Sequence, residues 1–280
     1  MKRLTRFDIG TATVSNYEYI LAFILDQAAN IHVEVRATGI LSTMPIDDGV
    51  ELPWAVRVGD GVAAAYHQHL FSLRIDPAID GFNNSVVYED SVPIDDPVID
   101  PMGVGYRTVN TTITKPGGYS LDIDRNRVYK IINPSSINPV SGRPAGYKLH
   151  AFASQMMLTR PKWYGYQRAT FCQKPIWVTK YRDDELYAAG EFTNQSQKDS
   201  GLSVWAARNE STQNQDVVLW HTFGLTHNPR PEDFPVMPME MIGLTLRPVN
   251  FFTESPSIDA PRSDQVQNQS VLVNRTCHNL

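Results

Sequence analysis

Proline and glycine divide this chain into segments that are too short for most helices. The sequence holds 19 prolines and 17 glycines among 280 residues, and the segments between them are rich in Val, Ile, Thr, Tyr and Phe, which favour strands. In residues 31 to 42, Ile31, Val33 and Val35 alternate with polar side chains, as in a half-buried strand. The sequence therefore predicts an all-β fold, a large antiparallel β-sandwich.

Similar patterns predict further strands, while the helical period is weak. The other predicted strands are residues 66 to 75, 85 to 90, 105 to 113, 118 to 123, 127 to 132, 176 to 181 and 216 to 223. Short helices are predicted only near residues 201 to 208 and 239 to 246. Clusters of Pro, Gly and Asp predict loops at residues 43 to 60, 91 to 104 and 134 to 145.

Composition excludes several classes of partner. The chain has 25 Lys and Arg against 30 Asp and Glu, a net charge of −5, without a basic run that could follow a phosphate backbone. We therefore expect no nucleic-acid partner. No apolar stretch reaches the roughly 18 residues of a spanning helix, and no targeting signal indicates a compartment. We expect one domain over residues 1 to 258 and a polar arm or tail over residues 259 to 280.

Histidines are the clearest candidates for a metal site. His67 and His69 lie two residues apart, so on a strand they project from one face, roughly 6.6 Å apart along the chain. His227 lies where a predicted strand meets a proline-rich turn, and His221 lies within that strand. His227 is the better third ligand, and His221 is better interpreted as an ordinary strand residue. Neutral imidazoles without a thiolate suit copper(II) or zinc.

Seven short motifs together resemble one enzyme family, the copper amine oxidases. They occur in family order over about residues 11 to 258, and together they are far more specific than any one alone. The motifs are Asn16 to Tyr19 (NYEY), Arg36 to Gly39 (RATG), His67 to His69 (HQH), Trp177 to Tyr181 (WVTKY), Asn209 to Ser211 (NES), Thr226 to Pro238 with its RPEDFPVMP, and NFFTESP from Asn250 to Pro256.

The resemblance implies a specific cofactor and reaction. Tyr17 would be the precursor of topaquinone, which forms a Schiff base with the substrate, and Asn16 would position this quinone. His67, His69 and His227 would bind copper(II), and Tyr19 would be a structural neighbour. The implied reaction converts primary amines and dioxygen to aldehyde, ammonia and hydrogen peroxide. The implied fold is the C-terminal part of the catalytic β-sandwich, truncated at its N-terminal side, and the implied assembly is a homodimer.

Two departures from the family pattern affect the expected chemistry. The catalytic base of the family is an aspartate far upstream of the quinone tyrosine, and only sixteen residues precede Tyr17 here. Asp8 and Glu18 are nearby acids, but neither matches the base, and positioned general bases contribute about 10² to 10⁴ in rate.

Met237 is either part of the copper surroundings or a thioether that fills a gap in the core.

The second departure concerns a further metal site. The resemblance implies a calcium or manganese site from the carboxylates of Asp76 and Asp216 and the carbonyls of Pro77 and Val217. Ala78 stands where a further carboxylate is usual.

Two other functions stay open at this point. The chain could be a catalytically degenerate β-sandwich that binds a metal without turnover, or a zinc hydrolase that uses the three histidines around a metal-bound water.

Overall fold

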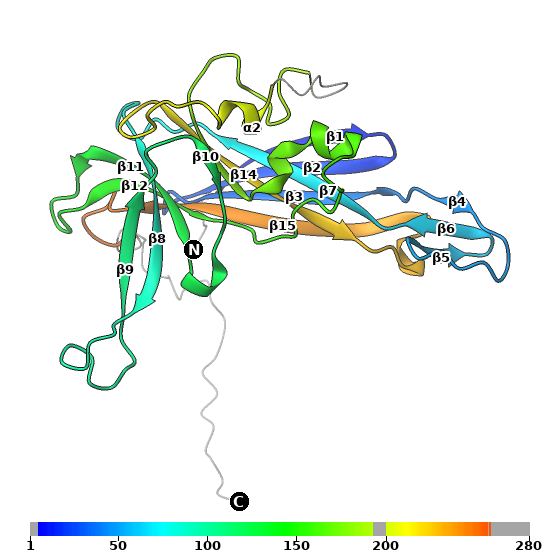
Figure 1. The fold of residues 1–280 in the computed structure, drawn as a ribbon, viewed down its shortest axis with the longest axis horizontal. Coiled ribbons are helices and arrows are strands. Elements are labelled where there is room, and N and C mark those ends of the chain that lie inside the picture. The colour runs from blue at the N-terminus through cyan, green and yellow to red at the C-terminus, as the bar shows by residue number, and fades with distance from the viewer. Residues whose placement is uncertain (1–4, 193–199, 257, 259–280) are drawn as a thin grey trace, which may run out of the picture.

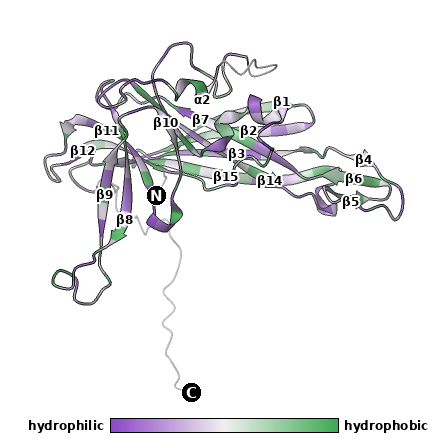
Figure 2. Ribbon diagram, viewed as in Figure 1, coloured by the Kyte–Doolittle hydropathy of each residue, from purple (hydrophilic) through white to green (hydrophobic). Residues whose placement is uncertain are grey.

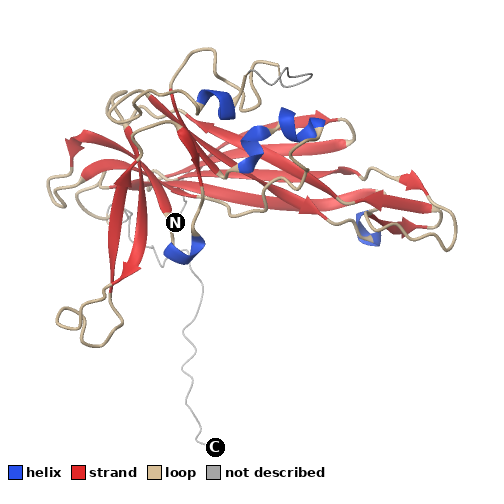
Figure 3. Cartoon of the chain, viewed as in Figure 1, coloured by secondary structure: helices blue, strands red, loops and turns tan. Residues whose placement is uncertain are grey.

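Strands make up most of the described chain, with only short helical turns between them (Figure 3). The structure is a computed structural model that describes residues 5–192, 200–256 and 258. Its largest sheet has eight strands, in the spatial order β1 (Thr5–Val14), β2 (Tyr17–Asp26), β3 (Ile31–Ile40), β15 (Val236–Val249), β12 (Pro144–His150), β11 (Val128–Ile137), β8 (Ser85–Pro93) and β9 (Tyr106–Thr112).

Two smaller sheets and a few helical turns complete the described fold (Figure 1). The four-stranded sheet has the order β10 (Gly117–Tyr119), β13 (Ile176–Lys180), β14 (Val217–His227) and β7 (His67–Ile75). The three-stranded sheet has the order β4 (Met44–Pro45), β6 (Val62–Ala65) and β5 (Ala55–Gly59). The helical turns are η1 (Ile123–Arg125), α1 (Tyr164–Arg168), η2 (Thr170–Gln173), α2 (Leu202–Trp205) and η3 (Pro231–Asp233).

The eight-stranded and four-stranded sheets pack face to face and enclose the main core. Buried Val35 and Leu244 of the larger sheet belong to one apolar cluster with Val178, Leu219 and Phe223 of the smaller sheet. Apolar residues recur along these strands in Figure 2. Because burial of such a side chain contributes about 1.5–3 kcal/mol, this shared cluster holds the two sheets together. The predicted antiparallel β-sandwich is confirmed.

Strand β14 is buried on both of its faces. Leu219 faces the other sheet, while Val218 and Trp220 pack on the outer side with Trp205 of α2. A strand covered on both sides has a nearly continuous apolar sequence, which explains the run VVLWHTFGL. This strand is therefore a rigid support for any residue near its end.

The predicted strands all lie in or overlap observed strands, but one helix and parts of all three loops were predicted wrongly, since the expected loop at 91 to 104 begins with the end of β8. Residues 239 to 246 form the middle of β15, where exposed Met241 alternates with buried Ile242 and Leu244 in the period of a strand. The expected loop at 43 to 60 contains β4 and β5, and the one at 134 to 145 contains the end of β11 and the start of β12. The helix at 201 to 208 is confirmed in the shorter α2. The predicted tail at 259 to 280 lies outside the described residues.

The helices of the described chain give no sign of membrane insertion. None of them has the length and apolar character needed to cross a bilayer.

The β1–β2 hairpin approaches β3 very closely at one point. Its two-residue turn is Ser15–Asn16, and Tyr17, the first residue of β2, pairs with Gly39 of β3. Gly39 has a φ of 119°, and a Cβ atom there would lie 2.6 Å from the carbonyl oxygen of Asn16 and 2.8 Å from the Cα of Tyr17. Only glycine fits both the backbone conformation and this contact.

We predict that Gly39→Ala lowers the free energy of unfolding by about 1 to 3 kcal/mol, because the new Cβ strains the backbone and displaces the hairpin. The matched control is Gly10→Ala in β1, where a Cβ would meet nothing within 4 Å. Urea unfolding of both variants measures the effect. Equal stability of the two variants would contradict the close approach.

Candidate metal centre

The three predicted histidines meet between the two sheets of the sandwich. Strands β7 and β14 pair with His67 directly opposite His227, and His69 follows two residues along the same face of β7. The ring centroid of His67 lies 4.7 Å from that of His69 and 4.8 Å from that of His227. One nitrogen from each ring lies within 4.8 Å of the other two, so all three can bind one ion.

Hydrogen bonds fix which nitrogen of His67 and His227 carries the proton. Nδ1 of His67 lies 2.8 Å from the carbonyl oxygen of Ala65, which can only accept, so Nδ1 donates and Nε2 keeps its lone pair. Nε2 of His227 lies 3.2 Å from the Asp233 carboxylate and donates to it, which leaves Nδ1 unprotonated. These two free nitrogens face each other at 3.3 Å. Two lone pairs at this distance repel unless a cation lies beside them.

His69 supplies the third nitrogen. Its Nδ1 lies 2.6 Å from the Tyr19 hydroxyl, and its Nε2 is buried without a hydrogen-bond partner. A buried polar atom without a partner is costly, so it indicates a missing ligand. Burial, and then the neighbouring His67 and His227, lower the pKa of His69 to about 4. Burial also lowers the pKa of His67. Both rings are therefore neutral at pH 7, as metal binding requires.

Asp233 holds the His227 ring in place from behind. It ends the short helical turn η3, which Pro231 begins, and this turn brings its side chain back toward the end of β14. The backbone N–H and the guanidinium of Arg230 both donate to Asp233, at 2.8 and 2.9 Å. These contacts, with the His227 bond, lower the pKa of Asp233 to about 2 although its burial opposes this. The carboxylate stays ionised and fixes the proton on Nε2 of His227.

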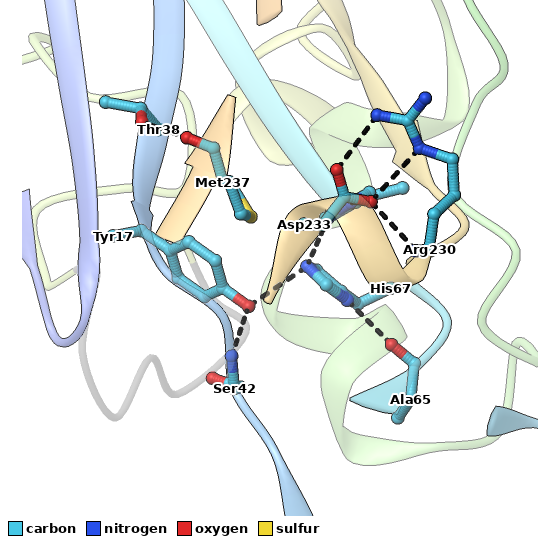
Figure 4. Close-up of polar contacts among 9 residues, drawn as sticks. Tyr17, Thr38, Ser42, Ala65, His67, Arg230, Asp233 and Met237 are labelled. Atoms are coloured by element: carbon cyan, nitrogen blue, oxygen red, sulfur yellow. Dashed lines mark hydrogen bonds and ion pairs between the residues drawn. The ribbon is translucent and has the colours of Figure 1, made fainter. Parts of the chain in front are cut away.

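The phenol of Tyr17 points at the same place (Figure 4). Its oxygen lies 3.2 Å from Nε2 of His67, and it accepts the backbone N–H of Ser42, also at 3.2 Å. Buried Met237 packs in a small apolar cluster against which the Tyr17 ring lies. Both the metal-side and the gap-filling interpretation of Met237 agree with this position. A redox-active phenol and three free imidazole nitrogens thus share one small volume.

Asn16 acts on the surroundings of Tyr17. Its amide nitrogen donates to the carbonyl of Ile40 and, at 2.8 Å, to the hydroxyl of Ser42. The side chain therefore ties the hairpin to the residue whose N–H reaches the phenol. That Asn16 positions a quinone stays a prediction. Its structural basis is indirect, because Asn16 contacts Ser42 and Ser42 contacts the Tyr17 phenol.

Other candidates from the sequence lie apart from the three histidines. His221 is fully buried on β14 and spends both nitrogens on the backbone, since it donates to the Pro175 carbonyl at 2.9 Å and accepts the Phe152 N–H at 3.0 Å. Asp8 pairs with Arg6, and Glu18 accepts the Thr13 hydroxyl at 2.9 Å. Neither acid is placed as a base toward Tyr17.

Some features of the predicted second cation site favour metal binding, and others oppose it. Asp216 has a buried carboxylate oxygen without a hydrogen-bond partner, and burial and then Asp76 raise its pKa. Asp76, however, is already paired with Arg74 at 2.9 Å, and Ala78 is exposed. Among the described side chains, only the three histidines form a cluster of the kind that holds a metal. The carbonyls of Pro77 and Val217 lie in the backbone next to these two aspartates.

The sequence interpretation missed several supporting residues. Asp233, Ser42 and Gly39 were not assigned roles, although two of them lie in quoted motifs. For Asp233 a signal exists, because Arg-Pro-Glu-Asp puts proline and acids at the start of a helical turn that follows His227. For Ser42 no such signal exists, because its contact with the Tyr17 phenol is made by a backbone N–H.

Comparison with known proteins assigns this geometry to one family. Residues 6–267 match the family model described as "Copper amine oxidase, enzyme domain". Copper amine oxidase 1 of Aspergillus niger is 46% identical over 95% of the chain and 40% of its own length. Histamine oxidase of Arthrobacter globiformis is 38% identical over 90% of the chain and 37% of its own length.

A solved structure shares both sequence and fold. The crystal structure of a copper-containing benzylamine oxidase from Hansenula polymorpha is 50% identical, with a TM-score of 0.90 over 94% of the chain and 42% of that protein. The chain thus spans about two fifths of the length of the relatives that it matches.

We predict that Asp233→Asn weakens copper binding by about 10- to 100-fold, the usual effect of losing an outer partner of a metal-bound histidine. Equilibrium dialysis against copper(II), followed by metal analysis, measures this affinity. Glu232→Gln is the matched control, because it neutralises the adjacent exposed carboxylate of the same turn. His69→Ala removes a proposed ligand, so its copper affinity gives the lower limit of the measured range. Equal affinities of the Asp233 and Glu232 variants would disprove the role of Asp233.

Proposed function

Because the chain belongs to the copper amine oxidase family, we propose that it takes part in the oxidative deamination of primary amines. In this proposal His67, His69 and His227 bind copper(II), and Tyr17 is converted to topaquinone. One observation carries it: the Tyr17 phenol lies 3.2 Å from a histidine nitrogen whose lone pair is free for a metal.

The residues fit copper better than zinc. Three neutral imidazoles without a thiolate suit either ion, but conversion of the neighbouring phenol to a quinone needs a metal that changes its oxidation state, which zinc does not. When bound, copper and dioxygen supply the oxidation of the phenol, and the resulting quinone supplies the carbonyl that accepts electrons from the amine.

The chain contributes orientation to this chemistry. The Ser42 N–H holds the phenol oxygen, and Asn16 holds Ser42 in turn. Gly39 allows the hairpin to lie close enough for both contacts. Asp233 keeps Nδ1 of His227 unprotonated, and the Ala65 carbonyl does the same for Nε2 of His67. A fixed tyrosine beside fixed ligands is what formation of a cofactor from the protein's own side chain requires.

The proposal includes a primary amine and dioxygen as substrates and a homodimer as the assembly. Relatives named for histamine and for benzylamine support the amine class. The homodimer follows from the family resemblance alone.

A second candidate function is a metal-binding β-sandwich without turnover. It is favoured by one observation, since Asp8 and Glu18 both have other partners and no base was assigned from the sequence. Loss of a positioned general base would lower the rate by about 10² to 10⁴. Such a chain could still form the quinone, so the two candidates separate at the turnover step.

We predict that the copper-loaded, aerated chain gives a positive redox-cycling quinone stain, and that Tyr17→Phe abolishes it because the ring then lacks the phenol oxygen. Tyr19→Phe is the control, since the Tyr19 hydroxyl contacts His69 and the Tyr19 ring is not the one oxidised; at saturating copper this variant keeps the stain. Peroxide release from benzylamine or histamine then tests turnover. Stain without peroxide supports the second candidate, and an unstained chain with unmodified Tyr17 by mass disproves the proposal.

We also propose that a calcium or manganese ion binds between Asp76 and Asp216, with the Pro77 and Val217 carbonyls. The unpaired buried oxygen of Asp216 supports it, and Arg74 competes for Asp76. Elemental analysis of the chain after dialysis against both ions tests this: about one bound ion is expected in the wild type and a marked loss in Asp216→Asn. Identical counts in the two proteins would rule this site out.

A further inference from the structure

His69 differs from the other two histidines in the group that contacts its outer nitrogen, the one that faces away from the cluster. The outer nitrogens of His67 and His227 bond to a carbonyl and to a carboxylate, which can only accept. The outer nitrogen of His69, Nδ1, bonds instead to the Tyr19 hydroxyl at 2.6 Å. Because a hydroxyl can donate or accept, this contact by itself does not fix the position of the His69 proton.

Packing holds the ring of Tyr19 in place. It lies 5.7 Å from the His69 ring and 5.4 Å from the Phe71 ring, roughly perpendicular to both. Its direct partners on the neighbouring strands are Ala12 and Ala37, whose small side chains leave room for a large ring on this face. The hydroxyl oxygen therefore stays beside Nδ1, and only its hydrogen can turn.

Both groups of this contact are neutral at pH 7. Burial, and then the neighbouring Tyr17, raise the pKa of Tyr19 above its ordinary value, so the hydroxyl keeps its hydrogen. The pKa of His69 is lowered to about 4, so its ring carries a single proton. The contact thus joins a neutral phenol and a neutral imidazole, whose one proton lies on either Nδ1 or Nε2.

Without an ion, the cluster favours the proton on Nε2 of His69. One nitrogen from each ring lies within 4.8 Å of the other two, and those of His67 and His227 both present lone pairs. A third lone pair on Nε2 would be repelled by both, whereas an N–H there turns its positive end toward them. Nε2 has no hydrogen-bond partner, so this attraction acts through space. Nδ1 then carries the lone pair, and the Tyr19 hydroxyl donates to it.

A bound ion reverses this arrangement. The ion needs the lone pair of Nε2, so the His69 proton must lie on Nδ1, which donates it to the Tyr19 oxygen. The ring loses a proton at one nitrogen and gains one at the other, so its charge does not change, and the phenol keeps its own hydrogen. The positive ion also makes the Nδ1–H a stronger donor, because charge-assisted hydrogen bonds are roughly twice as strong as neutral ones.

We propose that Tyr19 positions His69 for the metal by reversing this hydrogen bond. Its hydroxyl donates to Nδ1 in the empty cluster and accepts from Nδ1 when Nε2 binds the ion. A carbonyl or carboxylate in the same place would satisfy only the second state. The hydroxyl thus lets the empty cluster stay assembled and also stabilises the bound one. This inference rests on the metal site of the proposed function, and it gives Tyr19 a role beyond that of a structural neighbour.

Nitrogen NMR of the histidine rings tests the reversal. Zinc(II) is the probe, because it suits three imidazoles and has no redox chemistry that could alter Tyr17. We expect the His69 proton on Nε2 in the zinc-free chain and on Nδ1 in the zinc-bound chain, with the signals assigned by their loss in His69→Ala. His67 and His227 are expected to keep their protons on Nδ1 and Nε2 in both forms. A His69 proton on the same nitrogen in both forms overturns the proposal.

Removal of the hydroxyl tests its contribution to metal binding. Tyr19→Phe keeps the ring, but the bound state loses the stronger of the two hydrogen bonds, so we expect zinc(II) affinity to fall about tenfold in competition dialysis. Tyr147→Phe is the matched control, because it removes another half-buried hydroxyl, which donates to the Ala29 carbonyl at 3.1 Å. Its affinity is expected to equal that of the wild type. Thermal midpoints without zinc show that both variants are folded, and equal affinities of the two variants overturn the proposal.

Failure of this inference is distinguishable from failure of the proposed function. A wild-type chain that binds neither zinc(II) nor copper(II) overturns the proposed metal site, and this inference with it. A wild-type chain that binds both ions, together with an unchanged affinity of Tyr19→Phe or an unmoved His69 proton, overturns this inference alone.

Discussion

The antiparallel register between β7 and β14 is the constraint on which the candidate metal centre depends. It sets His67 opposite His227, although 160 residues separate them in the sequence. A slip of one residue would turn the imidazoles of one strand to the other face of the sheet. Gly224 supports this register, because a Cβ atom there would collide with the carbonyl oxygen of His69. The site is thus held by paired backbone, with strand β14 buried on both sides.

The candidate site also depends on which nitrogen of each histidine bonds to a protein partner. Each imidazole uses one nitrogen for a protein partner: the Ala65 carbonyl for His67, the Tyr19 hydroxyl for His69 and the Asp233 carboxylate for His227. The remaining nitrogens converge. Without an ion, two of them face each other and the third is buried without a partner. The histidine cluster is therefore electrostatically incomplete by itself, and a cation bound among the three nitrogens would complete it. Tyr17 belongs to the same arrangement, because its phenol is held against one of these nitrogens.

The two sheets of the sandwich differ in size, and this difference affects more than the histidine cluster. Eight strands face four, so the smaller sheet covers β3 and β15 but stops short of much of β2. Tyr17 and Tyr19 lie under β7, whereas Leu21 and Phe23 lie outside it. The hairpin that carries the candidate cofactor residue is thus both part of the site and part of an open apolar surface.

Local sequence patterns were sufficient for much of the fold and for part of the site. The alternation of Ile31, Val33 and Val35 predicted β3, and the spacing of His67 and His69 predicted a shared face, because side-chain direction along a strand repeats every two residues. The helix predicted at 239 to 246 failed because its apolar spacing also fits a strand, and pairing with β3 and β12 decided the outcome. Family motifs added Tyr17 and His227. They gave no role to Asp233 or Ser42, whose contacts depend on how the chain turns back.

The choice between His221 and His227 shows where sequence information ends. The two residues lie six positions apart on one strand, so they share a face, and periodicity cannot separate them. The sequence by itself determined that β14 forms, that it is apolar and that it carries both imidazoles inward. The turn after β14 and the family motif favoured His227, but only the tertiary structure gave the physical reason: the register with β7 sets His227 against His67 and sets His221 against Leu73, about 20 Å further along the strand.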